Sequence, residues 1–93
     1  MIELFAATAP TDIANLRRAL EQADPAGLSM AAHALKGSCS NFGAASLYGL
    51  CIQIEKLALN ANLHGAADVI TRAGKELDRL LDALHAYRQA SLP

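Results

Sequence analysis

The chain has 93 residues, a length that suits one hydrophobic core, and we expect a single domain over residues 1–93. Apolar residues make up 53% of it, with few aromatic side chains, which is typical of helices packed through small aliphatic groups. A formal net charge of −1 gives no positive field to attract nucleic acid or anionic lipid. Because no apolar run reaches the about 18 residues of a membrane span, and no basic-then-apolar leader is present, we expect a cytoplasmic location without membrane insertion.

The beginning of the chain predicts a short helix followed by a longer one. Residues 1–8 form a short apolar segment, and Pro10, followed by threonine and aspartate, indicates a new helix N-terminus. Apolar residues then recur at helical spacing over about residues 10–23, at Ile13, Leu16 and Leu20. We therefore expect a short N-terminal helical extension ahead of the first long helix.

A second helix is expected from Asp24 and Pro25, because an aspartate followed by a proline is typical of an N-cap and a first helical position. Gly43 is placed to end this helix. Its inward stripe follows spacings of three and four residues and consists of Leu28, Ala32, Leu35, Cys39 and Phe42.

Two further helices complete the pattern. The third is expected from about Ala44, and its predicted buried residues are Leu47, Leu50, Cys51, Ile54, Leu57 and Ala58. The next break is expected at Asn60, Asn62, His64 and Gly65. From Ala66 the stripe continues through Ile70, Ala73, Leu77, Leu80, Leu84 and Tyr87. Strand signals are absent, so the sequence predicts an all-α antiparallel four-helix bundle with the short N-terminal extension.

The two cysteines, Cys39 and Cys51, show neither a CxxC motif nor a metal-ligand spacing. Periodicity places both inside the bundle. We interpret them as buried free thiols rather than as a disulfide or metal ligands.

His33 is the candidate functional residue because it lies on the outer face of the second helix. At about 100° per residue it falls roughly opposite Leu35, away from the apolar stripe. The residues that share or border its face are Ser29, Met30, Lys36, Gly37, Ser38, Ser40 and Asn41.

Gly37 and Lys36, which lie beside His33, indicate which chemistry this face could support. A glycine inside a helix costs about 1 kcal/mol relative to alanine, and here its missing side chain would let another molecule approach the imidazole. Lys36 would place a positive charge beside a phosphoryl group on that ring. An imidazole is largely neutral at cytoplasmic pH, so it can attack an acyl phosphate without strong activation. Because no carboxylate cluster could hold magnesium, the metal and the aspartate must come from a partner, which predicts a carrier rather than a complete enzyme.

The string from His33 to Ser38, HALKGS, followed by Asn41, Phe42, Gly43 and Ala44, resembles the signature of the histidine-containing phosphotransfer (HPt) family. The resemblance covers almost the whole chain. It implies phosphorylation of His33 on its outer ring nitrogen, with Lys36 as charge partner and Gly37 as clearance for a receiver domain. Ser38 would support local hydrogen bonding, and Glu55 stands where relatives often carry a polar residue that orients the histidine. Some relatives have a further basic residue where this chain has Leu59.

By this resemblance the domain is a phosphorelay carrier in two-component signalling. It would accept a phosphoryl group from a receiver aspartate and pass it to another receiver. It needs no cofactor of its own, and Mg²⁺ is expected on the receiver. A stand-alone protein and a module of a hybrid sensor kinase attached to the membrane both remain open, as do the receiver, the direction of transfer and the oligomeric state.

Two other functions are set beside this one. A helical bundle that binds a protein without phosphotransfer could use the same face. A hydrolase or transferase with His33 as general base lacks a second catalytic group. His64, expected in the connection before the last helix, and His85, near the end of that helix, are interpreted as ordinary surface residues because neither has a lysine and a glycine one turn away.

Overall fold

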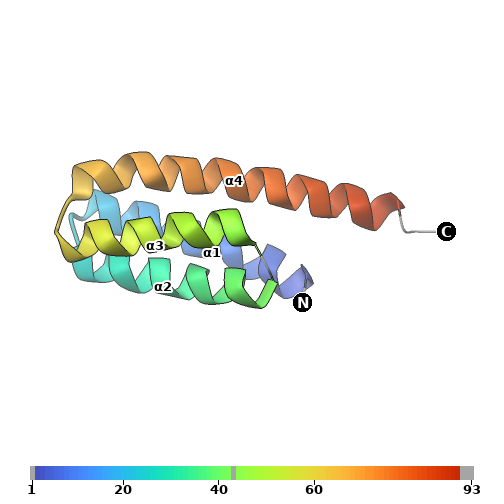
Figure 1. The fold of residues 1–93 in the computed structure, drawn as a ribbon, viewed down its shortest axis with the longest axis horizontal. Coiled ribbons are helices and arrows are strands. Elements are labelled where there is room, and N and C mark those ends of the chain that lie inside the picture. Colours follow the sequence, from blue (N-terminus) through green and yellow to red (C-terminus); the bar gives the residue numbers. More distant parts are fainter. Residues whose placement is uncertain (1, 43, 91–93) are drawn as a thin grey trace.

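The chain folds into four helices, each antiparallel to the next (Figure 1). The computed structural model describes residues 2–42 and 44–90, without the side chains of 2–4, 41–42 and 87–90. The helices are α1 (Ile2–Glu21), α2 (Pro25–Phe42), α3 (Ala45–Leu59) and α4 (Leu63–Ala90). Helix α2 packs on α1 and α3, and α4 packs on the same two helices from the other side, so that α2 and α4 lie across the bundle from each other. The predicted all-α four-helix bundle is confirmed.

Small and aliphatic side chains from all four helices fill the centre of the bundle, and no charged residue is buried among those described. In α2, the predicted stripe is fully buried at Leu28, Ala32, Leu35 and Cys39. The side chain of Phe42, residue Gly43 and the side chain of Tyr87 lie outside the described part. Two residues of α3 predicted to be buried, Leu50 and Leu57, are only partly so.

The predicted helix start at Pro10 is wrong, because α1 runs without a break from Ile2 to Glu21 with the proline inside it. A proline in a helix interior removes one backbone hydrogen bond and crowds the preceding turn, at about 3 kcal/mol. Phe5 and Ala9, which precede it, are both buried in the bundle core. Burial of these side chains offsets the penalty, so the expected extension is simply the first turns of α1.

The turns before α2 and α4 have the same backbone conformation and lie at the same end of the bundle (Figure 1). In each, an alanine takes a positive φ, 51° at Ala23 and 53° at Ala61, and the next residue caps the following helix. Asp24 Oδ1 accepts a hydrogen bond from the Gly27 amide at 3.1 Å, and Asn62 Oδ1 accepts one from the Gly65 amide at 3.0 Å. The cap predicted at Asp24 is confirmed. His64 and Gly65, expected in a break, belong to the first turn of α4 because Asn62 caps the helix before them.

Cys39 and Cys51 are buried free thiols, as predicted, and they meet across the contact of α2 with α3. The pKa of the Cys51 thiol is raised above its ordinary value. The larger cause is a hydrogen bond with Cys39, and the second is burial. None of the described helices has both the length and the apolar character that a bilayer crossing requires, and this includes α4 with its 28 residues.

Replacing Pro10 by alanine restores the missing donor in α1. We expect a gain of roughly 1–3 kcal/mol in the free energy of unfolding, since alanine is the better helix former by about 3 kcal/mol and the restricted unfolded chain returns part of that. Urea unfolding followed by circular dichroism measures it. Pro25→Ala is the matched control, because proline at the first helical position is already accommodated and its removal should bring no gain. A Pro10→Ala protein of unchanged or lower stability would contradict a continuous α1.

Candidate functional site

His33 stands on the outer face of α2, where packing of the stripe on the opposite side of the helix holds it. Its side chain is 74% exposed, whereas Leu35, two residues later, is completely buried. Burial of the stripe fixes the rotation of α2 about its own axis, so the imidazole cannot turn inward without exposing leucine side chains. The outer position that the helical periodicity predicted for His33 is confirmed.

Glu55 of α3 reaches across to this face and lies between two residues of α2. Its Oε2 is 3.8 Å from His33 Nδ1, and its Oε1 is 2.8 Å from Lys36 Nζ. The first distance exceeds that of a hydrogen bond, while the second is that of a close ion pair. The structure therefore brings together the histidine, lysine and glutamate that the sequence singled out separately.

The contact with Glu55 raises the pKa of the Lys36 ammonium above its ordinary value. Oε1 of Glu55 is hidden from water, and the Lys36 ammonium lies 2.8 Å from it. In the described part of the chain no other donor satisfies that oxygen. Lys36 is thus held by a carboxylate, a contact absent from the sequence-based prediction, in which it is the charge partner of a phosphoryl group on His33.

Gly37 adjoins this group and faces open space. A Cβ atom built on it would meet nothing within 4 Å apart from its own helix, so no neighbouring helix requires the glycine. Ser38 donates from its hydroxyl to the Ala34 carbonyl at 3.4 Å, which ties it to its own helix. Ser40 is exposed, and the side chain of Asn41 lies outside the described residues.

A shallow hollow opens beside His33, lined by Ala26, Ser29, Met30, His33 and Glu55. Met30 is 73% exposed, and Leu59, one turn after Glu55 on α3, is 86% exposed; they are the large apolar side chains that stand out most in the described part. Exposed apolar residues beside a polar site are typical of surfaces that bind other proteins. Sequence periodicity predicts Met30 on this face, whereas the family resemblance marks the position of Leu59 only as one where some relatives have a basic residue.

The other two histidines, His64 and His85, are exposed on α4 and lie away from this group, as expected. Among the residues that the structure describes, no three or more His, Cys, Asp or Glu side chains gather in a way that could hold a metal ion. The site thus consists of an exposed imidazole, an ammonium and a carboxylate on an open helical surface.

A comparison with protein families finds that the Hpt domain matches residues 1–88. No curated protein and no solved structure matches the chain significantly. The family match covers nearly the whole sequence and includes α1 to α3 completely and α4 except for its last two residues. Members of this family carry phosphoryl groups on histidine in phosphorelay signalling. The chain belongs to the Hpt domain family.

Proposed function

We propose that His33 accepts a phosphoryl group from an aspartyl phosphate of one receiver domain and passes it to the aspartate of another. The observation that carries this proposal is the exposed imidazole whose Nδ1 faces a carboxylate while its other nitrogen is left for a partner. Lys36 and Gly37 support it, the first by its charge and the second by the open space at its Cβ position.

Glu55 selects the reactive nitrogen in this proposal. A carboxylate beside Nδ1 favours the tautomer that carries its proton there, so the lone pair lies on Nε2. Nε2 attacks the phosphorus, the bond from phosphorus to the aspartyl oxygen breaks, and the aspartate leaves as a carboxylate. The ring keeps its Nδ1 proton and gains a positive charge, which Glu55 stabilises as the 3.8 Å separation shortens to a hydrogen bond.

Lys36 lies near two anions once the phosphoryl group is on Nε2. In the structure, without a phosphoryl group, the ammonium is paired with Oε1 of Glu55 at 2.8 Å. A phosphoryl group brings about −1.5 to −2 charges, more than the carboxylate does, so it attracts the ammonium at least as strongly. We infer that Lys36 moves partly from Glu55 toward the phosphoryl group, which leaves Glu55 free to hold the imidazolium.

Magnesium and the acceptor aspartate belong to the receiver in this proposal, because phosphoryl transfer needs charge neutralisation that a single lysine does not provide. The domain then acts as a carrier and binds receivers in turn. Ser29, Met30, Gly37, Ser38, Ser40 and Asn41 are the proposed contact residues around His33. Cytoplasmic location and a place within a hybrid sensor kinase are compatible with this role.

The variant His33→Gln should take up no phosphoryl group, while its thermal unfolding stays close to that of the wild type, because the side chain lies outside the core. Incubation with a phosphorylated receiver, followed by a test for acid-labile, base-stable phosphate, measures uptake. His64→Gln, at another exposed histidine, should behave as the wild type. A wild-type chain that binds receivers without ever gaining phosphate would instead indicate an interaction module.

Replacing Lys36 by alanine should slow transfer and shorten the lifetime of the phosphohistidine, by roughly 5-fold or more, because the phosphoryl charge loses its cationic contact. The control is Lys75→Ala, which removes an exposed lysine of α4 and should change neither quantity. Rapid-quench phosphotransfer and decay of the isolated phosphoprotein provide the two measurements. Equal decay in both variants would mean that Lys36 serves only the ion pair with Glu55.

Gly37 is expected to affect stability and transfer in opposite directions. Since open space surrounds its Cβ position, Gly37→Ala and Gly37→Gln should raise the free energy of unfolding by roughly 0.5–1 kcal/mol. Transfer from a receiver should fall, more for glutamine than for alanine. Gly49→Ala, at a helical glycine of α3 with equally open surroundings, calibrates the stability gain in thermal melts. Undiminished transfer by the glutamine variant would remove the clearance role.

A further inference from the structure

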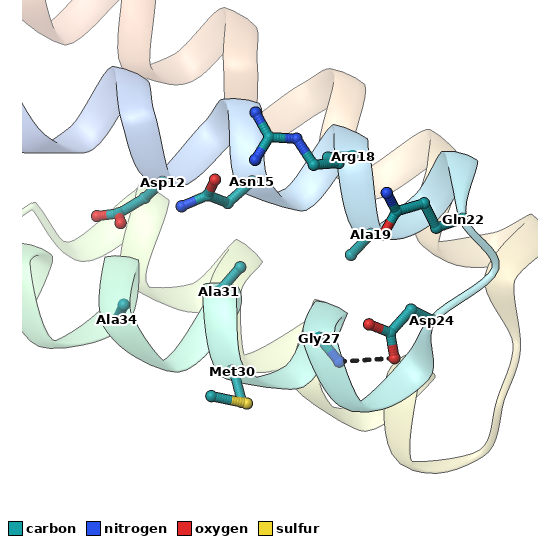
Figure 2. Close-up of a pocket in the computed structure, with 10 residues that line it drawn as sticks. All are labelled: Asp12, Asn15, Arg18, Ala19, Gln22, Asp24, Gly27, Met30, Ala31 and Ala34. Atoms are coloured by element: carbon teal, nitrogen blue, oxygen red, sulfur yellow. Dashed lines mark hydrogen bonds between the residues drawn. The ribbon is translucent and has the colours of Figure 1, made fainter.

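A second surface groove runs between α1 and α2 (Figure 2), whereas Glu55 belongs to α3, the other helix that packs on α2. Helix α1 contributes mostly polar side chains to it, and α2 contributes small residues and Met30. The residues that line it are Asp12, Asn15, Arg18, Ala19, Gln22, Asp24, Gly27, Met30, Ala31 and Ala34. Figure 2 shows Asp12 and Asn15 on the edge of α1 that borders α2, with Ala34 and Ala31 facing them from α2.

None of the three charged residues of this groove has an ion-pair partner in the described part of the chain. Asp24 is occupied as the cap of α2, which leaves Asp12 and Arg18. Arg18 is exposed, and Asp12 is half-buried. Burial raises the pKa of the Asp12 carboxyl above its ordinary value, as expected for an acid that loses water without gaining a cation. A basic group brought to Asp12 by another molecule would relieve this penalty, and an acidic group would pair with Arg18.

The groove and the hollow beside His33 are parts of one surface. Met30 lines both of them, and Ala34, at the Asp12 end of the groove, is the next residue after His33. A specific protein interface buries about 800 Å² on each partner, whereas a helix with its side chains is about 10 Å wide. A globular partner that reaches His33 on α2 therefore also covers the neighbouring edge of α1.

We propose that this α1–α2 groove selects which receiver docks on His33, with Asp12 and Arg18 as the specificity-determining residues. The inference rests on the proposed carrier function and names the partner chemistry that it requires. The preferred receiver presents a basic side chain to Asp12 and an acidic side chain to Arg18. Because both charges lie at the margin of the interface, they act mainly on the association rate and on its dependence on salt.

The test compares two phosphoryl donors on the same variants. One donor is phosphoramidate, a small molecule that needs no docking surface. The other is the phosphorylated receiver that transfers fastest to the wild type among a panel of purified receiver domains. The variant is Arg18→Glu, and its matched control is Arg72→Glu, which makes the same charge change at an exposed position of α4, across the bundle from α2.

We expect Arg18→Glu to lower the rate of transfer from the receiver by roughly 3- to 10-fold at low salt, with a smaller loss at high salt. Its reaction with phosphoramidate should match the wild type, and Arg72→Glu should be normal with both donors. Asp12→Asn is the second variant. It should also lower the rate of transfer from the receiver. It should not lower the stability of the domain, because the pKa of the Asp12 carboxyl is raised in the folded state, and such a carboxyl destabilises the fold at pH values above its ordinary pKa, where it ionises.

Three other outcomes of these transfer experiments would contradict the inference. If Arg18→Glu and Arg72→Glu lower the rate of transfer from the receiver equally, the effect comes from net charge alone and the groove does not select the receiver. If Arg18→Glu and Asp12→Asn transfer as fast as the wild type, the inference is overturned while the carrier function stands. If the wild-type chain exchanges phosphate with no receiver, although phosphoramidate modifies His33, the proposed function fails and the inference fails with it.

Discussion

The rotation of α2 about its own axis is the constraint on which the rest of the site depends. Leu28, Ala32, Leu35 and Cys39 are completely buried, and burying each leucine contributes about 1.5–3 kcal/mol relative to leaving it exposed. Turning the helix by half a turn would expose these side chains and bury a lysine and a histidine in their place. The outward direction of His33 is therefore fixed by the buried stripe on the opposite side of α2. His33 can turn inward only if this part of the core is exposed.

Packing of α2 against α3 supplies the second condition, since it brings one carboxylate to both His33 and Lys36. The shared carboxylate links the ring and the ammonium, so a change of charge on one is felt by the other. In the proposed carrier function, Glu55 would pair with the lysine and orient the imidazole before transfer. After transfer, the new negative charge would compete for the lysine when the ring becomes positive. One glutamate can thus compensate opposite charges at successive steps.

Helical periodicity was sufficient to predict the bundle, the buried stripe of α2 and the exposed face of His33, because each of these depends only on residues close in sequence. The same reasoning failed at Pro10, where burial of Phe5 and Ala9 by other helices outweighs a local penalty. It also could not predict that Lys36 binds Glu55, because the two residues lie on different helices and their pairing depends on how these are aligned. The α1–α2 groove was missed for the same reason.

The surface around His33 is open, with shallow hollows bordered by α2. An open site gives no exclusion of water and no preorganised dipoles around a developing charge, and these are the main sources of catalysis by a protein. In the proposed carrier function, a receiver that covers the face would supply both when it docks. An exposed histidine on a rigid helix, with an open glycine beside it, is accordingly suited to being reached by the active sites of other proteins rather than to forming one of its own. The open space at Gly37 and the exposed Met30 and Leu59 fit the same proposal, because a docking protein needs clearance and apolar contact area around the histidine.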